Sequence, residues 1–188
     1  KRHPELTVVL AGREGDIRKA LEGKTYDATR LIILHKDQIV ENEEHNPAEA
    51  VRAKKDSSMM YGMQMVKNKE VDGMISAGNT GAVLSGATLL VGRIPGVLRP
   101  ALSVALPGRK GPVFLLDVGA NMDSKPAYLV QFAEMMSVYC RTQLGMKTPR
   151  VGLLNVGTEP GKGNGLVKEV YPLLEGDPEI CFAGNVEA

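Results

Sequence analysis

The chain has 188 residues, 43% of them hydrophobic, and 23 basic against 22 acidic side chains give a formal net charge of +1. This length and apolar content allow a sizeable core and exclude a mainly disordered chain. The near-neutral charge and the few aromatic residues, three Phe, five Tyr and no Trp, argue against a nucleic-acid-binding protein.

The chain begins with a strand–helix–strand pattern. Residues 6–10 and 31–34 are apolar runs that predict strands, and residues 14–21 predict a short helix between them. Residues 41–56 are polar and carry both charge signs, which predicts a segment on the surface.

A methionine-rich helix is predicted next, over about residues 58–68. Asp56 or Ser57 can cap its first turn, and the spacing of Met59, Met63 and Val66 places them on one apolar face. We interpret the methionines of this helix either as flexible core filling, which is the commoner role, or as the lining of an acyl-chain pocket. They are Met59, Met60, Met63 and Met65.

The rest of the chain repeats one pattern three times: a strand, a glycine-containing loop and a helix. The helix over residues 126–144 is the clearest, because Pro126 suits its first turn and Gly145 suits its end. The strands are expected over residues 71–76, 112–116 and 151–154, the loops over 77–81, 117–121 and 155–163, and the other helices up to about 90 and 174, with further strands at 101–105 and 180–182.

Alternating strands and helices predict a single α/β domain over residues 1–188, with a mostly parallel sheet covered on both faces. Loops that follow parallel strands gather at one edge of the sheet, so we expect the three glycine loops to converge. Each loop opens a helix, whose free N–H groups favour an anion, and a phosphate or acyl-phosphate site follows. The alternative is that the glycines only turn the chain.

Other kinds of site find little support. No loop has the GxGxxG or P-loop pattern, and the three histidines have no metal-ligand spacing, so we expect no cofactor and no metal. No Ser lies in a GxSxG motif, and Cys140 and Cys181 have no local His partner. If the protein is an enzyme, its nucleophile is therefore expected to come from the substrate.

Six motifs follow one another along the chain: RAKKDSS at 52–58, SAGNTGA at 76–82, GRIPG at 92–96, DVGANMDSKP at 117–126, VGLLNVGTE at 151–159 and GNVE at 184–187. In this order they resemble the PlsX family, the bacterial acyl-carrier-protein:phosphate acyltransferases of phospholipid synthesis. The resemblance implies an α/β/α sandwich similar to the isocitrate and isopropylmalate dehydrogenases and to phosphotransacetylase. It also implies transfer of a long-chain acyl group from acyl carrier protein to inorganic phosphate, which gives acyl phosphate.

The resemblance assigns roles to individual residues. Lys162 and Asn121 are expected to be catalytic, by binding phosphate, polarising the thioester carbonyl or stabilising the oxyanion. Basic side chains are expected to dock the acidic carrier protein; they are Arg52, Lys54, Lys55, Arg93 and Arg99. The expected phosphate- and substrate-binding residues are Ser76, Gly78, Asn79, Thr80, Gly81, Asp117, Gly119, Asp123, Lys125, Asn155, Gly157, Thr158, Glu159 and Asn185.

The family pattern is incomplete in this sequence. The strand and DAMGGD loop that open PlsX proteins are missing, and the sequence ends soon after GNVE, so we expect a fragment that also lacks the C-terminal helices. The family further implies a cytoplasmic homodimer that touches the membrane through those missing helices. Two alternatives stay open: a short-chain phosphate acyltransferase acting on acyl-coenzyme A, and a non-catalytic module that binds anions or the carrier protein.

Overall fold

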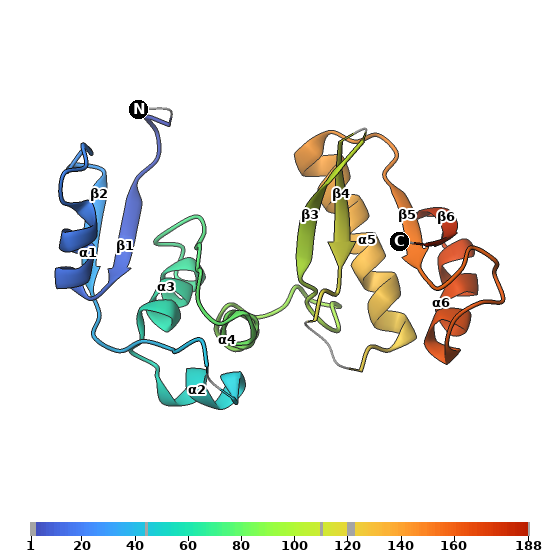
Figure 1. Ribbon diagram of the computed structural model, residues 1–188, viewed down its shortest axis with the longest axis horizontal. Coiled ribbons are helices and arrows are strands. Elements are labelled where there is room, and N and C mark those ends of the chain that lie inside the picture. Colours follow the sequence, from blue (N-terminus) through green and yellow to red (C-terminus); the bar gives the residue numbers. More distant parts are fainter. Residues whose placement is uncertain (1–2, 44, 110, 120–122, 188) are drawn as a thin grey trace. The chain divides into compact units, whose positions relative to one another are not determined.

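The computed structural model describes residues 3–43, 45–109, 111–119 and 123–187. The chain forms two compact units, unit 1 over Lys1–Gly92 and unit 2 over Arg93–Ala188, and each is described by itself (Figure 1). The single domain expected over residues 1–188 stays a prediction. The elements of unit 1 are β1 (Val8–Gly12), α1 (Glu14–Leu21), β2 (Leu31–His35), α2 (Pro47–Ala53), α3 (Ser58–Lys67), α4 (Thr80–Gly86) and a π-helical turn, η1 (Ala87–Val91).

The strands β1 and β2 of unit 1 pair in parallel, with Val8 opposite Leu31, and α1 connects them. This confirms the predicted strand–helix–strand start of the chain. The imidazole of His35 accepts a hydrogen bond through Nδ1 from the backbone N–H of Glu14, at 3.1 Å. The end of β2 therefore holds the first turn of α1.

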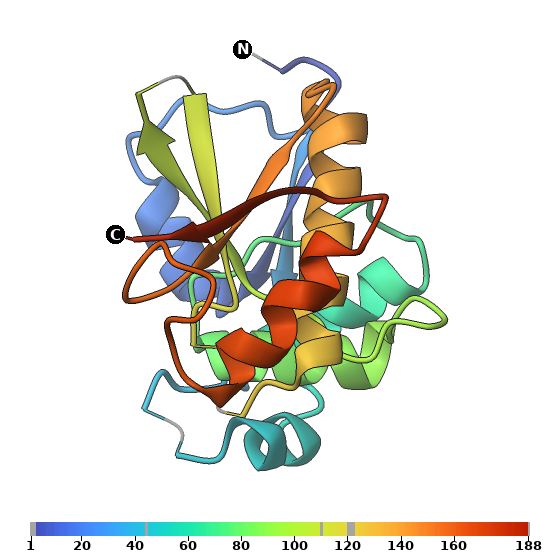
Figure 2. The ribbon, with the colours of Figure 1, turned by 90° about the vertical axis from the view of Figure 1, so that its right-hand side faces the viewer.

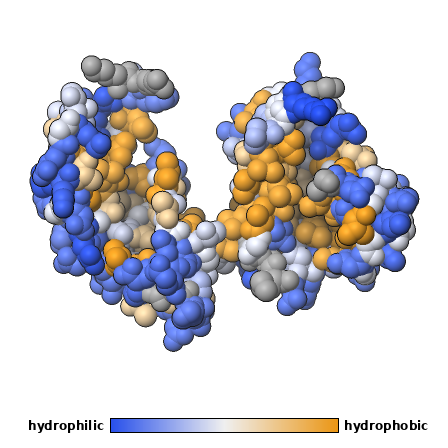
Figure 3. Space-filling view, in the orientation of Figure 1, coloured by the Kyte–Doolittle hydropathy of each residue, from blue (hydrophilic) through white to orange (hydrophobic). Residues whose placement is uncertain are grey.

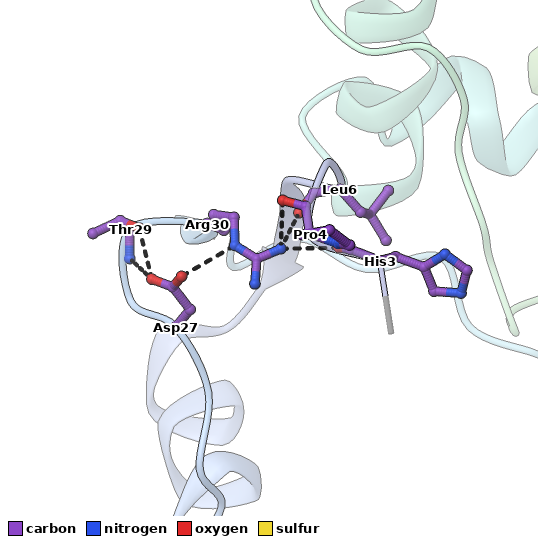
Figure 4. A network of polar contacts seen from close by, with 6 residues as sticks. All are labelled: His3, Pro4, Leu6, Asp27, Thr29 and Arg30. Carbon is purple, nitrogen blue, oxygen red and sulfur yellow. Dashed lines mark hydrogen bonds and ion pairs between the residues drawn. The ribbon is translucent and has the colours of Figure 1, made fainter. Parts of the chain in front are cut away.

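The guanidinium of Arg30 fastens the segment that leads into β1 (Figure 4). Its Nη1 donates to the carbonyl oxygens of His3, Pro4 and Leu6, at 2.9, 3.0 and 3.3 Å. Its Nε donates to Asp27 Oδ2 at 3.1 Å. The hydroxyl and the backbone N–H of Thr29 donate to Asp27 Oδ1, and these bonds, with that from Arg30, lower the pKa of Asp27 to about 2.

This network predicts a pH-dependent contribution to stability. The pKa of Asp27 falls from 3.8 to about 2 on folding, so its ionised form stabilises the fold above pH 3.8 and that contribution disappears as the pH falls towards 2. Asp27→Asn should lower the free energy of unfolding near neutral pH and lose that effect in acid, as measured by urea unfolding. Asp72→Asn, on an exposed turn, is the control. An Asp27→Asn effect that is the same at every pH would contradict the account.

The core of unit 1 lies between α2, α3 and α4. Its buried residues are mostly aliphatic or methionine, with Val51 and Ala82 fully buried. Ser57 caps α3 as predicted, since its hydroxyl accepts from the backbone N–H of Met60 at 3.4 Å. The helix α3 and the helical run from Thr80 to Val91 agree with the sequence predictions.

Most of the described residues in the surface segment predicted over 41–56 are exposed, but the segment contains a helix that was not predicted, α2. Asn46 caps this helix by accepting from Glu49 N at 3.3 Å, and Pro47 lies in its first turn. One prediction in unit 1 is wrong, the strand over residues 71–76. Residues 71–76 form no strand within the described part of unit 1, and Ile75 is 100% exposed. An apolar run becomes a strand only where another strand pairs with it, and composition alone does not reveal that partner.

Unit 2 contains an antiparallel hairpin and a parallel strand pair. In the hairpin Ser103 lies opposite Leu116, so the expected parallel arrangement is wrong at this point. Only two residues separate Gly108 from its partner Gly111, and so short a connection allows only antiparallel pairing. The elements of unit 2 are β3 (Ser103–Gly108), β4 (Gly111–Leu116), α5 (Pro126–Leu144), β5 (Arg150–Leu154), α6 (Gly165–Glu175) and β6 (Cys181–Val186).

The strands β5 and β6 pair in parallel, with Arg150 opposite Cys181, and α6 connects them. The helix α5 has the predicted bounds and ends at Gly145, whose φ of 66° is left-handed. Figure 2 shows α5 and α6 on the same side of this strand pair. The apolar faces of the two helices form the core of unit 2. Ala133 comes from α5, and Val170 and Leu174 come from α6.

Hydrophobic surface remains exposed in both units. Figure 3 shows it gathered in the middle of unit 1, within a hydrophilic rim, and over β3 and β4 in unit 2. In the hairpin, Val104, Leu106 and Val113 are 42%, 43% and 57% exposed.

Candidate functional site

The loop between β5 and α6, residues 155–164, is the best-defined part of the candidate site. Asn155 closes it: its Nδ2 donates to the carbonyl oxygen of Lys162 at 3.0 Å. Its Oδ1 accepts from the backbone N–H of Val156 at 2.8 Å. One side chain therefore supplies both a donor and an acceptor to the loop backbone and fixes its two ends.

Asn185, on β6, fastens the middle of the same loop. It is only 6% exposed, and its Nδ2 donates to the carbonyl oxygen of Glu159 at 2.8 Å. Its Oδ1 has no partner among the described residues. Leaving a buried acceptor unpaired costs about 1–3 kcal/mol, so the bond that Nδ2 makes to Glu159 is obtained at a cost on the other side of the same amide.

Lys162 is only loosely held in this loop. Its Nζ lies 3.9 Å from Glu159 Oε1, and the two side chains are 56% and 64% exposed. A surface ion pair of this kind contributes about 0–1 kcal/mol. The lysine can therefore leave the glutamate for a bound anion at little cost.

Glycine is required at one position of the loop, Gly163. Its φ is 96°, and a Cβ there would lie 2.5 Å from Asn155 Oδ1. At the buried Gly157 a Cβ would lie 2.9 Å from Glu159 Oε2, the end of an exposed side chain that can move away. The missing side chain of Gly163 lets Asn155 approach the backbone, so this glycine does more than turn the chain.

The start of α6 completes the loop. Asn164 caps the helix by accepting from Val167 N at 3.0 Å. The other N–H groups of the first turn have no partner within the helix and carry its positive dipole. Lys162 lies two residues before this cap, so a lysine and a helix N-terminus follow each other along the chain, as an anion site needs.

The loop after β4 is held by Asp117. This residue has a left-handed φ of 59°, and its Oδ2 accepts from the hydroxyl of Ser124 at 2.5 Å. Gly119 is also left-handed, Asp123 is exposed, and Lys125 precedes the first turn of α5 with its side chain exposed. Asn121, predicted as catalytic, lies outside the described residues.

The third predicted loop, residues 76–81, belongs to unit 1. Asn79 caps α4 by accepting from Ala82 N at 2.9 Å, and its Nδ2 donates to Asn42 O at 2.8 Å. Ser76 Oγ accepts from Gly78 N at 3.2 Å. A Cβ on Gly81 would lie 2.9 Å from Pro47 Cγ, whereas the side chain of Thr80 is exposed.

The structure brings part of the predicted site together. The loops after β4 and β5 both lie at the end of unit 2 where α5 and α6 begin, as Figures 1 and 2 show. This agrees with the predicted edge for those two loops. Residues 76–81 lie in unit 1, so the convergence of all three loops stays a prediction. Thr158 lies exposed in the loop after β5.

The basic residues predicted to dock a carrier protein lie in both units. Arg52 and Lys55 are exposed near the end of α2, and Lys54 between them is half-buried. Arg99 is exposed in unit 2, and the guanidinium of Arg93 donates to the carbonyl oxygen of Leu98. Their role in docking remains a prediction.

A separate hollow of about 230 Å³ lies where β5 and β6 begin, away from the glycine loop that follows β5. None of the predicted site residues lines it. Its polar side chains are Arg141, Lys147, Thr148 and Glu179, and the Nη1 of Arg141 already donates to the carbonyl oxygen of Glu179 at 3.3 Å.

Within the part of the chain that the structure describes, no group of three or more His, Cys, Asp or Glu side chains could hold a metal ion. No helix there is both long and apolar enough to cross a membrane.

Some contributors to the loops were not predicted. Asn164 could have been found, because an Asn directly before an apolar helical run is a typical cap. Ser124 and Asn42 gave no such signal, since their partners lie 7 and 37 residues away in the sequence.

The fold and the loops define an α/β protein with a glycine-containing loop that leads into a helix N-terminus. The chain belongs to the fatty acid synthesis protein family, whose model matches residues 1–188. The resemblance to the PlsX family is thereby confirmed.

Similar proteins agree with this assignment. A phosphate acyltransferase of Clostridium perfringens is 45% identical over 183 residues, which are 97% of this chain and 54% of that protein. A phosphate acyltransferase of Dictyoglomus turgidum is 47% identical over the same length and the same shares. The chain thus spans about half the length of these curated relatives. Among solved structures, EutD phosphotransacetylase from Staphylococcus aureus matches with a TM-score of 0.63 and 18% identity, over 96% of this chain and 61% of that one, and supports the α/β fold.

Two glycines in the same loop allow a matched test of its geometry. Gly163→Ala should destabilise unit 2 by about 1–2 kcal/mol, because alanine is disfavoured at a positive φ and its Cβ would clash with Asn155. Gly161→Ala is the control, since nothing lies within 4 Å of its Cβ position. Urea unfolding measures both variants. Equal stability of the two would show that the loop does not need this geometry.

Proposed function

We propose that the whole protein transfers a long-chain fatty acyl group from acyl carrier protein to inorganic phosphate, and that the acyl phosphate serves phospholipid synthesis. The observation that carries this proposal is the loop between β5 and α6. It combines a loosely held Lys162 with the N-terminal turn of a helix, which suits a phosphate anion. The family and the names of the relatives support the acyl transfer to phosphate.

In the proposed reaction, phosphate itself is the nucleophile. One phosphate oxygen attacks the carbonyl carbon of the acyl thioester, a C–O bond forms, and the carbonyl oxygen becomes an oxyanion. The intermediate collapses by breaking the C–S bond, and the thiolate of the carrier leaves and takes up the proton that the hydrogen phosphate nucleophile gives up. Lys162 binds the phosphate or stabilises the oxyanion, and the N–H groups at the start of α6 share the negative charge.

Other residues serve the same site in this proposal. Asn155 and Asn185 hold the loop through their bonds to the carbonyl oxygens of Lys162 and Glu159. Asn121 assists the oxyanion, as the family resemblance implies. The exposed Arg52 and Lys55 fit an acidic carrier protein by charge.

The proposal also covers the complete fold, the oligomeric state and the location of the whole protein. The whole protein would complete a three-layer α/β/α sandwich of the isocitrate dehydrogenase type, and the likeness to EutD phosphotransacetylase supports such a fold. It would act as a cytoplasmic homodimer with peripheral contact to the membrane.

Lys162→Ala tests the catalytic assignment. In the whole protein it should lower the rate of acyl phosphate formation by about 10²–10³-fold, the usual effect of removing one well-placed donor. Lys168→Ala, an exposed lysine on α6, should leave the rate unchanged. Near-normal turnover by a folded Lys162→Ala variant would refute the assignment.

The same assay separates the alternatives. Faster turnover with acyl-coenzyme A of short chain length than with acyl carrier protein would identify a short-chain phosphate acyltransferase. Binding of phosphate or carrier protein without phosphate-dependent loss of the thioester would identify a non-catalytic module.

A further inference from the structure

The core of unit 1 contains a cluster of methionine side chains between α3 and the helical run α4–η1. Met59, Met60 and Met63 are 7%, 5% and 3% exposed, and all three come from α3. They pack against Ala82, with Leu90 of η1 beside them. Methionine is unbranched and has three rotatable side-chain bonds, so such a cluster can change shape with little strain.

Glycines make the room for these side chains. A Cβ on Gly86 would lie 2.6 Å from Met63 Sδ and 3.0 Å from Met60 Sδ. A Cβ on Gly62 would lie 2.9 Å from Met74 Sδ. The sulfur atoms therefore occupy places that other residues would fill with their own side chains.

The cluster reaches the loop of residues 76–81. The Cε of Met59 lies 3.0 Å from the Cβ position of Gly78, one of the residues predicted to bind phosphate. At the other end the cluster meets η1, a π-helical turn of the kind that is frequent at functional sites. From Thr80 to Val91 the helical run extends about 17 Å at 1.5 Å per residue, which is far longer than an acetyl group.

We propose that this methionine cluster takes up the long acyl chain of the substrate. The inference rests on the proposed function, which supplies the long acyl chain, and on the predicted binding of phosphate by the loop of residues 77–81 in unit 1. From residues 76–81 the chain would run along α4 towards η1. Met59, Met60 and Met63 would rotate to line it, and the rotation of Met63 would vacate the space beside Gly86 that its sulfur atom now occupies. The bound ligand class is a linear fatty acyl chain.

Photo-crosslinking locates the chain directly. The probe is an acyl carrier protein loaded with a long acyl chain that carries a diazirine at its far end, mixed with the whole protein. Mass spectrometry should find the label on peptides that cover α3 and α4–η1. Labelling confined to other segments would overturn the proposal.

Chain-length selectivity provides a second measurement. Met63→Phe, which adds volume beside Gly86, should lower the ratio of kcat/KM for long over short acyl chains by about 10-fold. It should spare kcat/KM for the shortest chain, because only the far part of a long chain is displaced. Met63→Leu should lower the ratio less, and Met135→Leu, a half-buried methionine of unit 2, should not change it. An unchanged ratio in a folded Met63→Phe variant would contradict the proposal.

The two proposals can fail separately. If the unaltered protein forms no acyl phosphate from any thioester, the proposed function fails, and the crosslink still shows where an acyl chain binds. If acyl phosphate forms but the label and the ratio both exclude the methionine cluster, only the acyl-chain site fails.

Discussion

Hydrogen bonds from asparagine side chains to the backbone hold the glycine loops of both units. A loop rich in glycine has many backbone polar groups and few side chains, so its N–H and C=O groups need partners from elsewhere. The asparagine amide offers both a donor and an acceptor. Asn155 and Asn185 bond to carbonyl oxygens of the loop after β5, and Asn79 holds the corresponding loop of unit 1.

Because asparagine amides hold the backbone of the loop between β5 and α6, its charged side chains are not needed for that purpose. The backbone of residues 155–164, including the carbonyl oxygen of Lys162, is held by asparagine amides. The side chain of Lys162 makes only a weak contact with Glu159, at 3.9 Å. Gly163 serves the same end, because its missing side chain lets Asn155 close on the backbone. A rigid loop with one mobile cation fits a site that must bind phosphate and also respond to charge that develops during reaction.

Local signals predicted much of the fold. The bounds of α5 follow from Pro126, Gly145 and a long apolar stripe, and these signals lie within the helix itself. The strand expected at residues 71–76 and the pairing of β3 with β4 depend on which strands meet, and no local pattern encodes that. The helix α2 was not predicted, because only two of its seven residues, Ala50 and Val51, are buried and two residues do not make a recognisable apolar stripe.

The candidate site shows the same division. The glycine loops and their place after the strands were predictable, since parallel strands send such loops to one edge. The bond from Asn185 to Glu159 was not, because the two residues lie 26 positions apart. Their contact depends on the register of β5 against β6, which only the folded structure gives.

The central claim is that the loop of residues 155–164 binds phosphate. Titration of the isotope-labelled whole protein with inorganic phosphate, followed through its backbone amide NMR signals, tests this most directly. The account predicts saturable shifts at Gly163, Asn164 and Gly165, and their loss in the Lys162→Ala variant. Shifts confined to the hollow beside Arg141 and Lys147, or no saturable shift at all, would contradict it.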